Sequence, residues 1–473
     1  MPTLAGMGLA DTAALQQVRD VFAARFASGT APSLVYGVLD DGVLVDSDGF
    51  GAATLGGPPP TADTAYRIAS CTKSFTATAL LQLRDQGRID LDRPAIELVP
   101  ALSGLRLPTT DAPQPTVRTL ATMMGGLPTD DPWADRQESL SDSAFDEVLR
   151  AGIRALWAAG TRFEYSNLGY ALLGRAIAAT AGRPYVDVVR DDVLTPLGLQ
   201  ATGFDPTVAA PDGVATGYRK HGDAWEALPF SAPGAFSPIG GLFSTVRDLA
   251  RWMQWHLDAW RADADDAVLA RASRRLMQTA QCVVPPTEPV TVATGYGFGL
   301  FIAHDPARGL FAGHSGGYPG FSAYMRWHPA TGLGVVALEN ATYAGVSRPV
   351  IAALDGLVDA AGGAPVTPWP ETAAAQQALH GLLTGWDDAV ATRWFSANVD
   401  QDVPLERRRD AIAGLVAQAG ALAPPSGLTS STPAHRRWRV VGEHATLVCE
   451  LTMDPRDPPH VQSFTVTVEA PSA

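Results

Sequence analysis

Lysine is almost absent from this chain. Of its 35 lysine and arginine residues only Lys73 and Lys220 are lysine, and 49 acidic residues leave a net charge of −14. A nucleic-acid-binding protein needs a basic surface against the phosphates, so this charge balance excludes that class of partner. Because arginine meets almost every other need for positive charge, the lysine at position 73 stands out as a candidate for proton-transfer chemistry that arginine cannot perform.

Cysteine and long apolar runs are scarce as well. The three cysteines, Cys71, Cys282 and Cys449, are too few and too scattered for a disulfide framework or a zinc cluster. Metal-ligand spacing and a Gly-rich phosphate loop are both missing, so we expect no metal and no cofactor. No apolar run is long enough to cross a bilayer, and residues 1–15 lack a basic region before an apolar stretch. We therefore expect no membrane span and a cytoplasmic location, with the oligomeric state left open.

The composition supplies enough apolar sequence for more than one core, with 46% hydrophobic and 18% charged residues. A Gly/Pro-rich stretch at 363–370 predicts a linker. It separates a domain at 1–362 from a smaller C-terminal α+β domain at 371–473, which is large enough to fold alone. This tail combines helical stretches with alternating runs, at 373–383, 386–395, 405–418, 439–453 and 462–468.

The larger domain has strand signals at both ends and helical signals between them. Asp40-Asp41-Gly42 between two apolar runs predicts a β-hairpin. Residues 90–235 show helical segments separated by loops, with no convincing cluster of strands. Strands are predicted at 34–39, 43–46, 296–302, 310–313, 322–327 and 334–338, and helices at 11–26, 70–87 and 245–257. The fold class is therefore α+β, with one antiparallel sheet built from both ends of the domain and flanked by helices.

Lys73 follows a serine by three positions, in Ser70-Cys71-Thr72-Lys73, where the periodicity becomes helical. Residues three apart share a helical face, so the Lys73 amine can reach the Ser70 hydroxyl. A desolvated lysine can lose its proton and act as a base, whereas arginine cannot. Free N–H groups at the helix start also favour negative charge on an attacked carbonyl. The simpler interpretation of Ser70 is a helix N-cap, and that of Cys71 is a packing residue.

A second motif, Tyr165-Ser166-Asn167, stands at the entry to another predicted helix. The simpler interpretation makes Asn167 the cap and Tyr165 a packing residue. The functional one places the Tyr165 phenol near Lys73, where an ammonium group would lower the phenol pKa and the pair would share one mobile proton. Asn167 would then orient Lys73 and the amide of a substrate.

A third motif, His314-Ser315-Gly316-Gly317, ends a predicted strand. Glycines in such a place allow close approach of a ligand backbone. His314 would supply a proton or a hydrogen bond. The Gly317 N–H would join the Ser70 N–H as an oxyanion donor, with Ser315 and Gly316 beside the substrate. A lone histidine is usually structural, and that is the alternative for His314.

Together and in this order, the three motifs resemble the active-site serine family of penicillin-binding proteins and class C β-lactamases, over residues 10–355. The resemblance implies an antiparallel sheet flanked by helices, with an all-helical subdomain. It also implies that Ser70 is the acylated nucleophile, that Lys73 and Tyr165 transfer protons, and that Asn167 orients the substrate.

The third motif departs from most of that family, which has Lys-Thr/Ser-Gly where this chain has His314-Ser315-Gly316. This version resembles the D-aminopeptidases, D-amino-acid amidases, related esterases and penicillin-binding-protein-type thioesterases. It argues against β-lactam hydrolysis as the main activity. Relatives that act on peptides also carry a small C-terminal domain. Its basic clusters at 407–409 and 435–437 are candidate contacts for a substrate carboxylate, or simply a solvated charged face.

These features predict a serine acyl-transfer hydrolase that forms an acyl-Ser70 intermediate on peptide, amide or ester substrates containing D-amino acids. One alternative is a thioesterase that releases and cyclises a nonribosomal peptide, since the first half-reaction is the same. An alternative of another class is a catalytically silent sensor or binding module on the same fold. The filled polar positions of all three motifs argue against the silent module.

Overall fold

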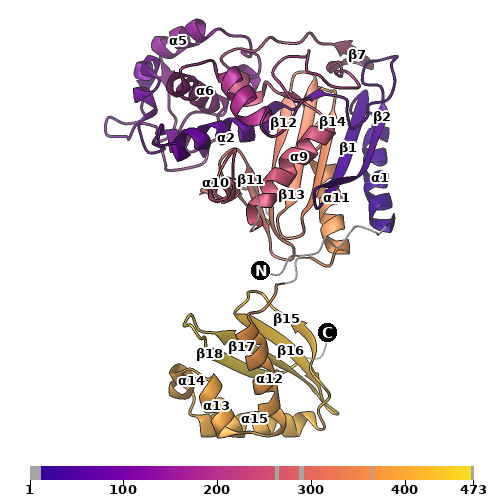
Figure 1. Cartoon of the computed structure of the whole chain (residues 1–473), viewed down its shortest axis with the longest axis vertical. Helices are drawn as coiled ribbons and strands as arrows, with labels where there is room; N and C mark the ends of the chain where they lie inside the picture. The colour runs from indigo at the N-terminus through magenta and orange to yellow at the C-terminus, as the bar shows by residue number, and fades with distance from the viewer. Residues whose placement is uncertain (1–11, 262–265, 287–291, 364–365, 470–473) are drawn as a thin grey trace. The chain divides into compact units, whose positions relative to one another are not determined.

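The computed structural model describes residues 12–261, 266–286, 292–363 and 366–469. The chain divides into two compact units, Met1–Ala364 and Pro365–Ala473, both drawn in Figure 1. The predicted linker at 363–370 coincides with this division, although its residues 364 and 365 lie outside the described part. The catalytic and accessory roles of the two units stay predictions.

An antiparallel sheet of eight strands forms the centre of the first unit, in the order β2-β1-β14-β13-β12-β11-β10-β9. Strand β1 (Ser33–Asp40) pairs with β2 (Val43–Gly51) on one side and β14 (Leu333–Glu339) on the other. The two ends of the domain therefore meet in one sheet, and the predicted α+β class is confirmed. The remaining strands are β9 (Cys282–Val283), β10 (Ala293–Tyr296), β11 (Phe301–Asp305), β12 (Gly309–Tyr318) and β13 (Phe321–His328).

Two turns show how local sequence shapes the sheet. Asp41 and Gly42 have φ of 46° and 89°, as a two-residue Asp-Gly hairpin turn requires, so the predicted hairpin is confirmed. The single strand predicted at 296–302 is wrong. The chain reverses between β10 and β11, with Gly299 at φ 71°, and the apolar residues on both sides of this turn resemble one continuous run.

Helices cover both faces of the sheet (Figure 1). Helix α9 (Val246–Leu257) packs on one face, against β1, β13 and β14, while α1 (Thr12–Ala27) and α11 (Ser347–Ala360) lie on the other. Thr245 caps α9 by accepting a hydrogen bond from the Asp248 N–H at 3.1 Å. The Asp248 carboxylate does not complete a capping box, because it accepts hydrogen bonds from the Ala201 N–H and the Thr202 hydroxyl instead.

A helical subdomain gathers beside the sheet, with α2 (Thr72–Asp85) between the two (Figure 1). Between 90 and 235 the strands form no larger cluster, as expected, although two short pairs interrupt the helices: β4 (Leu105–Arg106) with β5 (Ile153–Arg154), and β6 (Tyr218–His221) with β7 (Ala224–Ala227). Each pair is too short to give an alternating pattern in the sequence. The remaining helices are α3 (Val117–Ala121), α4 (Asp131–Ala134), α5 (Asp142–Ala151), α6 (Asn167–Ala181), α7 (Tyr185–Val189), α8 (Ser237–Gly240) and α10 (Arg271–Met277), with short turns η1 (Ala69–Cys71), η2 (Ala95–Glu97), η3 (Pro100–Gly104), η4 (Arg190–Leu194) and η5 (Asp258–Trp260). The short strands are β3 (Tyr66–Arg67), β4 (Leu105–Arg106), β5 (Ile153–Arg154), β6 (Tyr218–His221), β7 (Ala224–Ala227) and β8 (Phe243–Ser244).

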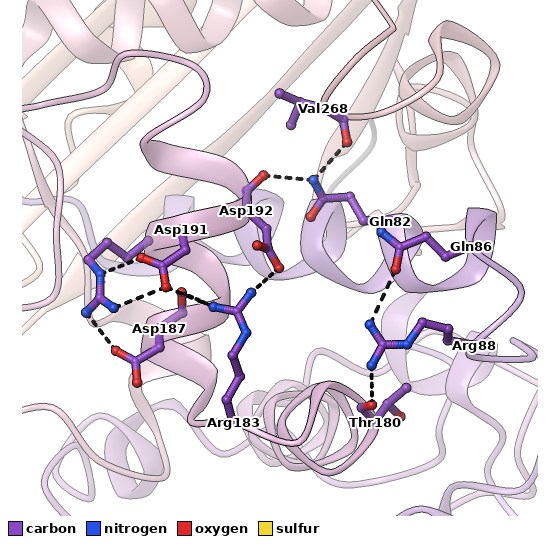
Figure 2. A network of polar contacts seen from close by, with 10 residues as sticks. Gln82, Gln86, Arg88, Thr180, Arg183, Asp187, Asp191, Asp192 and Val268 are labelled. Atoms are coloured by element: carbon purple, nitrogen blue, oxygen red, sulfur yellow. Dashed lines mark hydrogen bonds and ion pairs between the residues drawn. The ribbon is translucent and has the colours of Figure 1, made fainter.

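Polar contacts anchor the C-terminal end of α2, as Figure 2 shows. The Gln82 amide donates hydrogen bonds to the carbonyls of Asp192 at 2.9 Å and Val268 at 2.8 Å. Arg183 forms ion pairs with Asp191 and Asp192, which fixes the turn that carries one of these carbonyls. The helix that bears the predicted catalytic lysine is thus held firmly at its far end.

The second unit packs helices against a sheet in the order β15-β16-β17-β18. The alternating run predicted at 439–453 is two strands, because the chain turns at 442–445. Arg408, in one of the predicted basic clusters, donates hydrogen bonds to the carbonyls of Phe464 and Val399 inside this unit. Its elements are α12 (Pro370–Thr384), α13 (Asp388–Trp394), α14 (Ala397–Asp402), α15 (Leu405–Ala419), β15 (Ser426–Thr429), β16 (His435–Val441), β17 (Thr446–Met453) and β18 (Val461–Val468). Throughout the described ranges, the helices are too short or too polar to cross a bilayer.

Candidate active site

Ser70 lies in η1, the turn that leads directly into α2, and is 9% exposed. The residue before it, Ala69, has φ 48°, an uncommon conformation for a residue with a Cβ. Strand β12 packs tightly on this turn. A Cβ at Gly316 would lie 2.4 Å from the Ile68 carbonyl oxygen and 3.1 Å from the Ser70 nitrogen. Only glycine fits at position 316, and its contact fixes Ser70 against the sheet.

Lys73 is completely buried on the first turn of α2. Its Nζ lies 3.0 Å from Ser70 Oγ, 2.6 Å from Asn167 Oδ1 and 3.0 Å from the Ile239 carbonyl oxygen. The two carbonyl oxygens can only accept hydrogen bonds. A neutral amine would donate its two N–H groups to them and leave its lone pair for the Ser70 hydroxyl. The geometry is therefore that of a base beside its proton donor.

Burial lowers the pKa of Lys73 from 10.5 to about 8, and the carboxylates of Asp131, Asp135 and Asp130 oppose part of that shift. Desolvation disfavours the ammonium form, while nearby negative charge favours it. With a pKa near 8, about a tenth of the amine is neutral at pH 7. This balance keeps Lys73 able to exchange a proton near neutral pH.

Asn167 opens α6 and connects Lys73 to an acidic pair. Its Nδ2 donates to Asp131 Oδ1 at 2.5 Å, and its backbone N–H donates to Asp130 Oδ1 at 2.7 Å. The interpretation of Asn167 as the N-cap is wrong, because the Ser166 hydroxyl fills that role. Asn167 holds Lys73, and its contact with a substrate amide stays a prediction.

The roles of Asp130 and Asp131 were not predicted from the sequence. They begin the short helix α4, far from any of the three motifs in the sequence. An Asp-Asp pair ahead of a proline is typical of a helix start. Because that explanation is sufficient for the local sequence, the contact with Asn167 could not be predicted from it.

Tyr165 is half-buried, and the centre of its ring lies 5.0 Å from Lys73 Nζ. Its pKa is well above the ordinary value of 10, because burial and the carboxylates of Asp131 and Asp135 disfavour the phenolate, although a hydrogen bond with Ser70 acts in the other direction. The predicted lowering of this pKa by Lys73 is therefore wrong. As a neutral phenol, Tyr165 can donate a hydrogen bond and relay a proton, while Lys73 is the better base.

His314 is 1% exposed, and both of its ring nitrogens are occupied. Nδ1 donates to the Ser315 carbonyl at 2.5 Å, because a carbonyl can only accept, and Nε2 then accepts from the Tyr296 hydroxyl at 3.2 Å. Burial, reinforced by Lys73, lowers the His314 pKa to about 3. Of the two roles expected for His314, this neutral ring fits a hydrogen-bonding role and not proton supply. The partner, Tyr296, carries no motif that sequence reasoning could use.

Beyond Gly313, the edge of β12 that faces β11 is unpaired with that strand in the described residues. The two-residue turn at 319–320 makes Tyr318 and Phe321 a hydrogen-bonded pair. Alternation along the strand then directs the Gly317 N–H away from β13, towards the unpaired edge. The structure thus brings Ser70, Lys73, Tyr165, Asn167, His314, Gly316 and Gly317 together, while Ser315 contributes its carbonyl to the His314 ring.

Residues 18–360 match the model of the family described as Beta-lactamase. The chain belongs to the beta-lactamase family. Members of this superfamily are serine hydrolases, and this protein is one of them.

Relatives within the family include a D-alanyl-D-alanine-carboxypeptidase/endopeptidase, AmpH, of Escherichia coli strain K12. It is 28% identical over 288 residues, which cover 58% of this chain and 70% of AmpH. Penicillin-binding protein 4 of Amycolatopsis lactamdurans is 28% identical over 333 residues, which cover 67% of this chain and 79% of that protein.

Two solved structures have a similar fold. A D-stereospecific amidohydrolase from Streptomyces sp. has a TM-score of 0.59 and 27% identity, covering 73% of this chain and 98% of its own. The octameric penicillin-binding protein homologue from Pyrococcus abyssi has a TM-score of 0.63 and covers 93% of this chain and 91% of its own. At 22% identity, this second similarity supports the fold alone.

Proposed function

We propose that this enzyme cleaves peptides, amides or esters of D-amino acids through an acyl-Ser70 intermediate. The observation that carries the proposal is the position of the buried Lys73 amine, 3.0 Å from Ser70 Oγ and bound to two carbonyl acceptors. This arrangement leaves the lone pair of a neutral amine for the serine proton, which is how a base activates a hydroxyl nucleophile.

In the first half-reaction, Lys73 takes the Ser70 proton as Oγ attacks the substrate carbonyl carbon. The N–H groups of Ser70 and Gly317 donate hydrogen bonds to the developing oxyanion. When the bond to the leaving group breaks, the proton passes from Lys73, by way of the Tyr165 hydroxyl, to that group. In the second half-reaction a water molecule repeats the steps and releases the acid and free Ser70.

The charge of the site favours substrates without a carboxylate beside the scissile bond. His314 is neutral where most of the family has lysine, and its pKa of about 3 keeps it so. Asp130 and Asp131 lie behind the site, with Asp135, whose pKa burial raises to about 7. A free N-terminal ammonium, a neutral amide or an ester suits this field better than a C-terminal carboxylate. The relatives' printed names, a D-alanyl-D-alanine-carboxypeptidase and a D-stereospecific amidohydrolase, support the D configuration.

A substrate panel tests the proposal. It contains a D-alanine amide, a D-alanine ester, a D-dipeptide with a free N-terminus, an N-acetyl-D-Ala-D-Ala peptide, the L forms of each and a linear peptidyl thioester. We expect the free or neutral D substrates to turn over fastest, with an acyl adduct on Ser70 in intact-protein mass spectra. Preference for L forms or for the carboxylate peptide would contradict the proposal, and cyclic product from the thioester alone would assign the enzyme to peptide cyclisation instead.

The proposal also distinguishes an enzyme from a silent binding module. A fluorophosphonate should label wild-type enzyme stoichiometrically, because an activated serine hydroxyl attacks phosphorus. It should leave Ser70→Ala unlabelled. An unlabelled wild-type protein that still binds the D substrates would instead indicate the binding module.

A further inference from the structure

Tyr343 occupies an unusual position in the loop between β14 and α11. Its φ of 47° makes it one of four non-glycine residues with positive φ in the described part of the chain. A bulky side chain is strongly disfavoured in this conformation, and such strain collects at functional sites. The side chain is nevertheless 42% exposed, so core packing does not explain why tyrosine stands here.

The Tyr343 ring packs on the face of β12 at Gly317, next to the unpaired edge of the strand. A Cβ at Gly317 would be 2.6 Å from Tyr343 Cδ1, so the ring sits directly beside the strand residue whose N–H faces the site. The hydroxyl of Tyr343 donates to Asp135 Oδ2 at 2.6 Å and receives a 3.4 Å contact from Arg136 Nη1. The ring is thus held at both ends, by strand β12 and by the segment that follows α4.

These contacts close a loop around the reacting atoms. Asp131 begins α4 and binds Asn167, which binds Lys73, while Asp135 follows the same short helix. On the other side, Gly316 packs on the Ser70 turn, next to Gly317 and the Tyr343 ring. Tyr343 is the link in this loop that is open to solvent.

We propose that Tyr343 limits the length of substrate that the site accepts, by standing beside the unpaired β12 edge at Gly317 and bridging from there to Asp135. An extended peptide gains affinity by pairing with such an edge. Here the chain that pairs beside Ser70 has to end before the ring, which favours short substrates and exo-acting cleavage. The Asp135 hydrogen bond holds the ring between β12 and the segment that follows α4. This inference rests on the proposed acyl transfer at Ser70.

A series of probes of increasing length tests the inference. The reaction rates of wild type, Tyr343→Gly and Tyr343→Phe are measured with two sets of probes. One set contains alkyl fluorophosphonates of increasing chain length. The other contains D-peptides extended by one residue at a time at either end. Glycine tolerates positive φ, so Tyr343→Gly removes the ring together with the strain and should fold. Trp260→Ala, a change at an aromatic residue of similar exposure, 43%, serves as the matched control.

We expect wild type to disfavour the longest probes at one end of the substrate. The ratio of long-probe to short-probe reaction rates should rise about tenfold in Tyr343→Gly, as for removal of a steric block in a pocket. It should rise less in Tyr343→Phe, which keeps the ring, and not at all in Trp260→Ala. An unchanged ratio in a Tyr343→Gly enzyme whose Ser70 is still labelled overturns the length limit alone. No labelling of Ser70 in any variant overturns the proposed function and this inference together.

Discussion

Arg67 and Glu138 form an ion pair, with Nη1 and Oε2 3.4 Å apart and both side chains only 2% exposed. The Glu138 carboxylate also accepts hydrogen bonds from Ser237 Oγ at 2.8 Å and the Tyr318 hydroxyl at 3.3 Å. Ser237 begins α8, whose Ile239 carbonyl binds Lys73. The pair therefore joins three segments around the site: the strand before Ser70, the helix behind Lys73, and β12.

Replacing one member of this pair should be costly. Glu138→Gln leaves the Arg67 charge buried and unpaired, so we expect the free energy of unfolding to fall by about 3 kcal/mol. Glu226→Gln, which breaks the exposed pair with Arg219, should lower the free energy of unfolding far less, because solvent screens that pair. Urea denaturation of both variants makes the comparison. Equal losses would show that the Arg67–Glu138 pair contributes no more than a surface contact.

Lys73 cannot be replaced by arginine if its role is proton transfer. Lys73→Arg keeps a positive charge but has no accessible neutral form. We expect roughly a 10²–10⁴-fold loss of acylation rate, as large as for Lys73→Ala. Lys220→Arg, at the other, exposed lysine, should leave the rate unchanged. The rate of Ser70 labelling measures all three variants, and near wild-type labelling of Lys73→Arg would rule out the base role.

Acylation should depend on pH through Lys73. The amine acts only when neutral, so the rate should rise about tenfold per pH unit below the pKa of about 8 and level off above it. His314, with a pKa of about 3, should add no step between pH 5 and 8. Stability should increase from pH 8 to 10.5, because the unfolded chain binds a proton at Lys73 that the folded enzyme has lost. A flat rate profile across pH 6–9 would contradict a titrating base.

Gly316 should tolerate no side chain. In Gly316→Ala the new Cβ would meet the Ile68 carbonyl oxygen at 2.4 Å, so the Ser70 turn has to move away from β12. We expect acylation to fall by about two orders of magnitude, the scale of losing one oxyanion donor. The same substitution at Gly356, in α11 with nothing within 4 Å, should instead stabilise the protein by about 1 kcal/mol. Labelling rates and thermal unfolding separate the two effects.

The sequence was sufficient for the parts of the site that depend on local spacing. Ser70 and Lys73 share a helical turn, and the Asp41-Gly42 hairpin follows from its own dipeptide. The direction of the Tyr165 pKa could not be predicted from the sequence, because it is set first by burial in the folded enzyme and then by the carboxylates of Asp131 and Asp135, thirty or more residues away. Glu138 and Tyr343 were missed for a related reason. Their importance lies in contacts with distant segments, and no local pattern marks either residue.

The turn between β10 and β11 limits which substitutions the enzyme can accept without losing activity. A Cβ at Gly299 would lie 2.5 Å from the Lys73 carbonyl oxygen, so this turn presses on the backbone of the first turn of α2. A single methyl group added there would tilt that turn and separate amine from hydroxyl without altering either side chain. A substitution in this short loop could therefore inactivate the enzyme while every motif residue stays in place. For the same reason, an intact set of motifs in a homologue is not enough to infer activity.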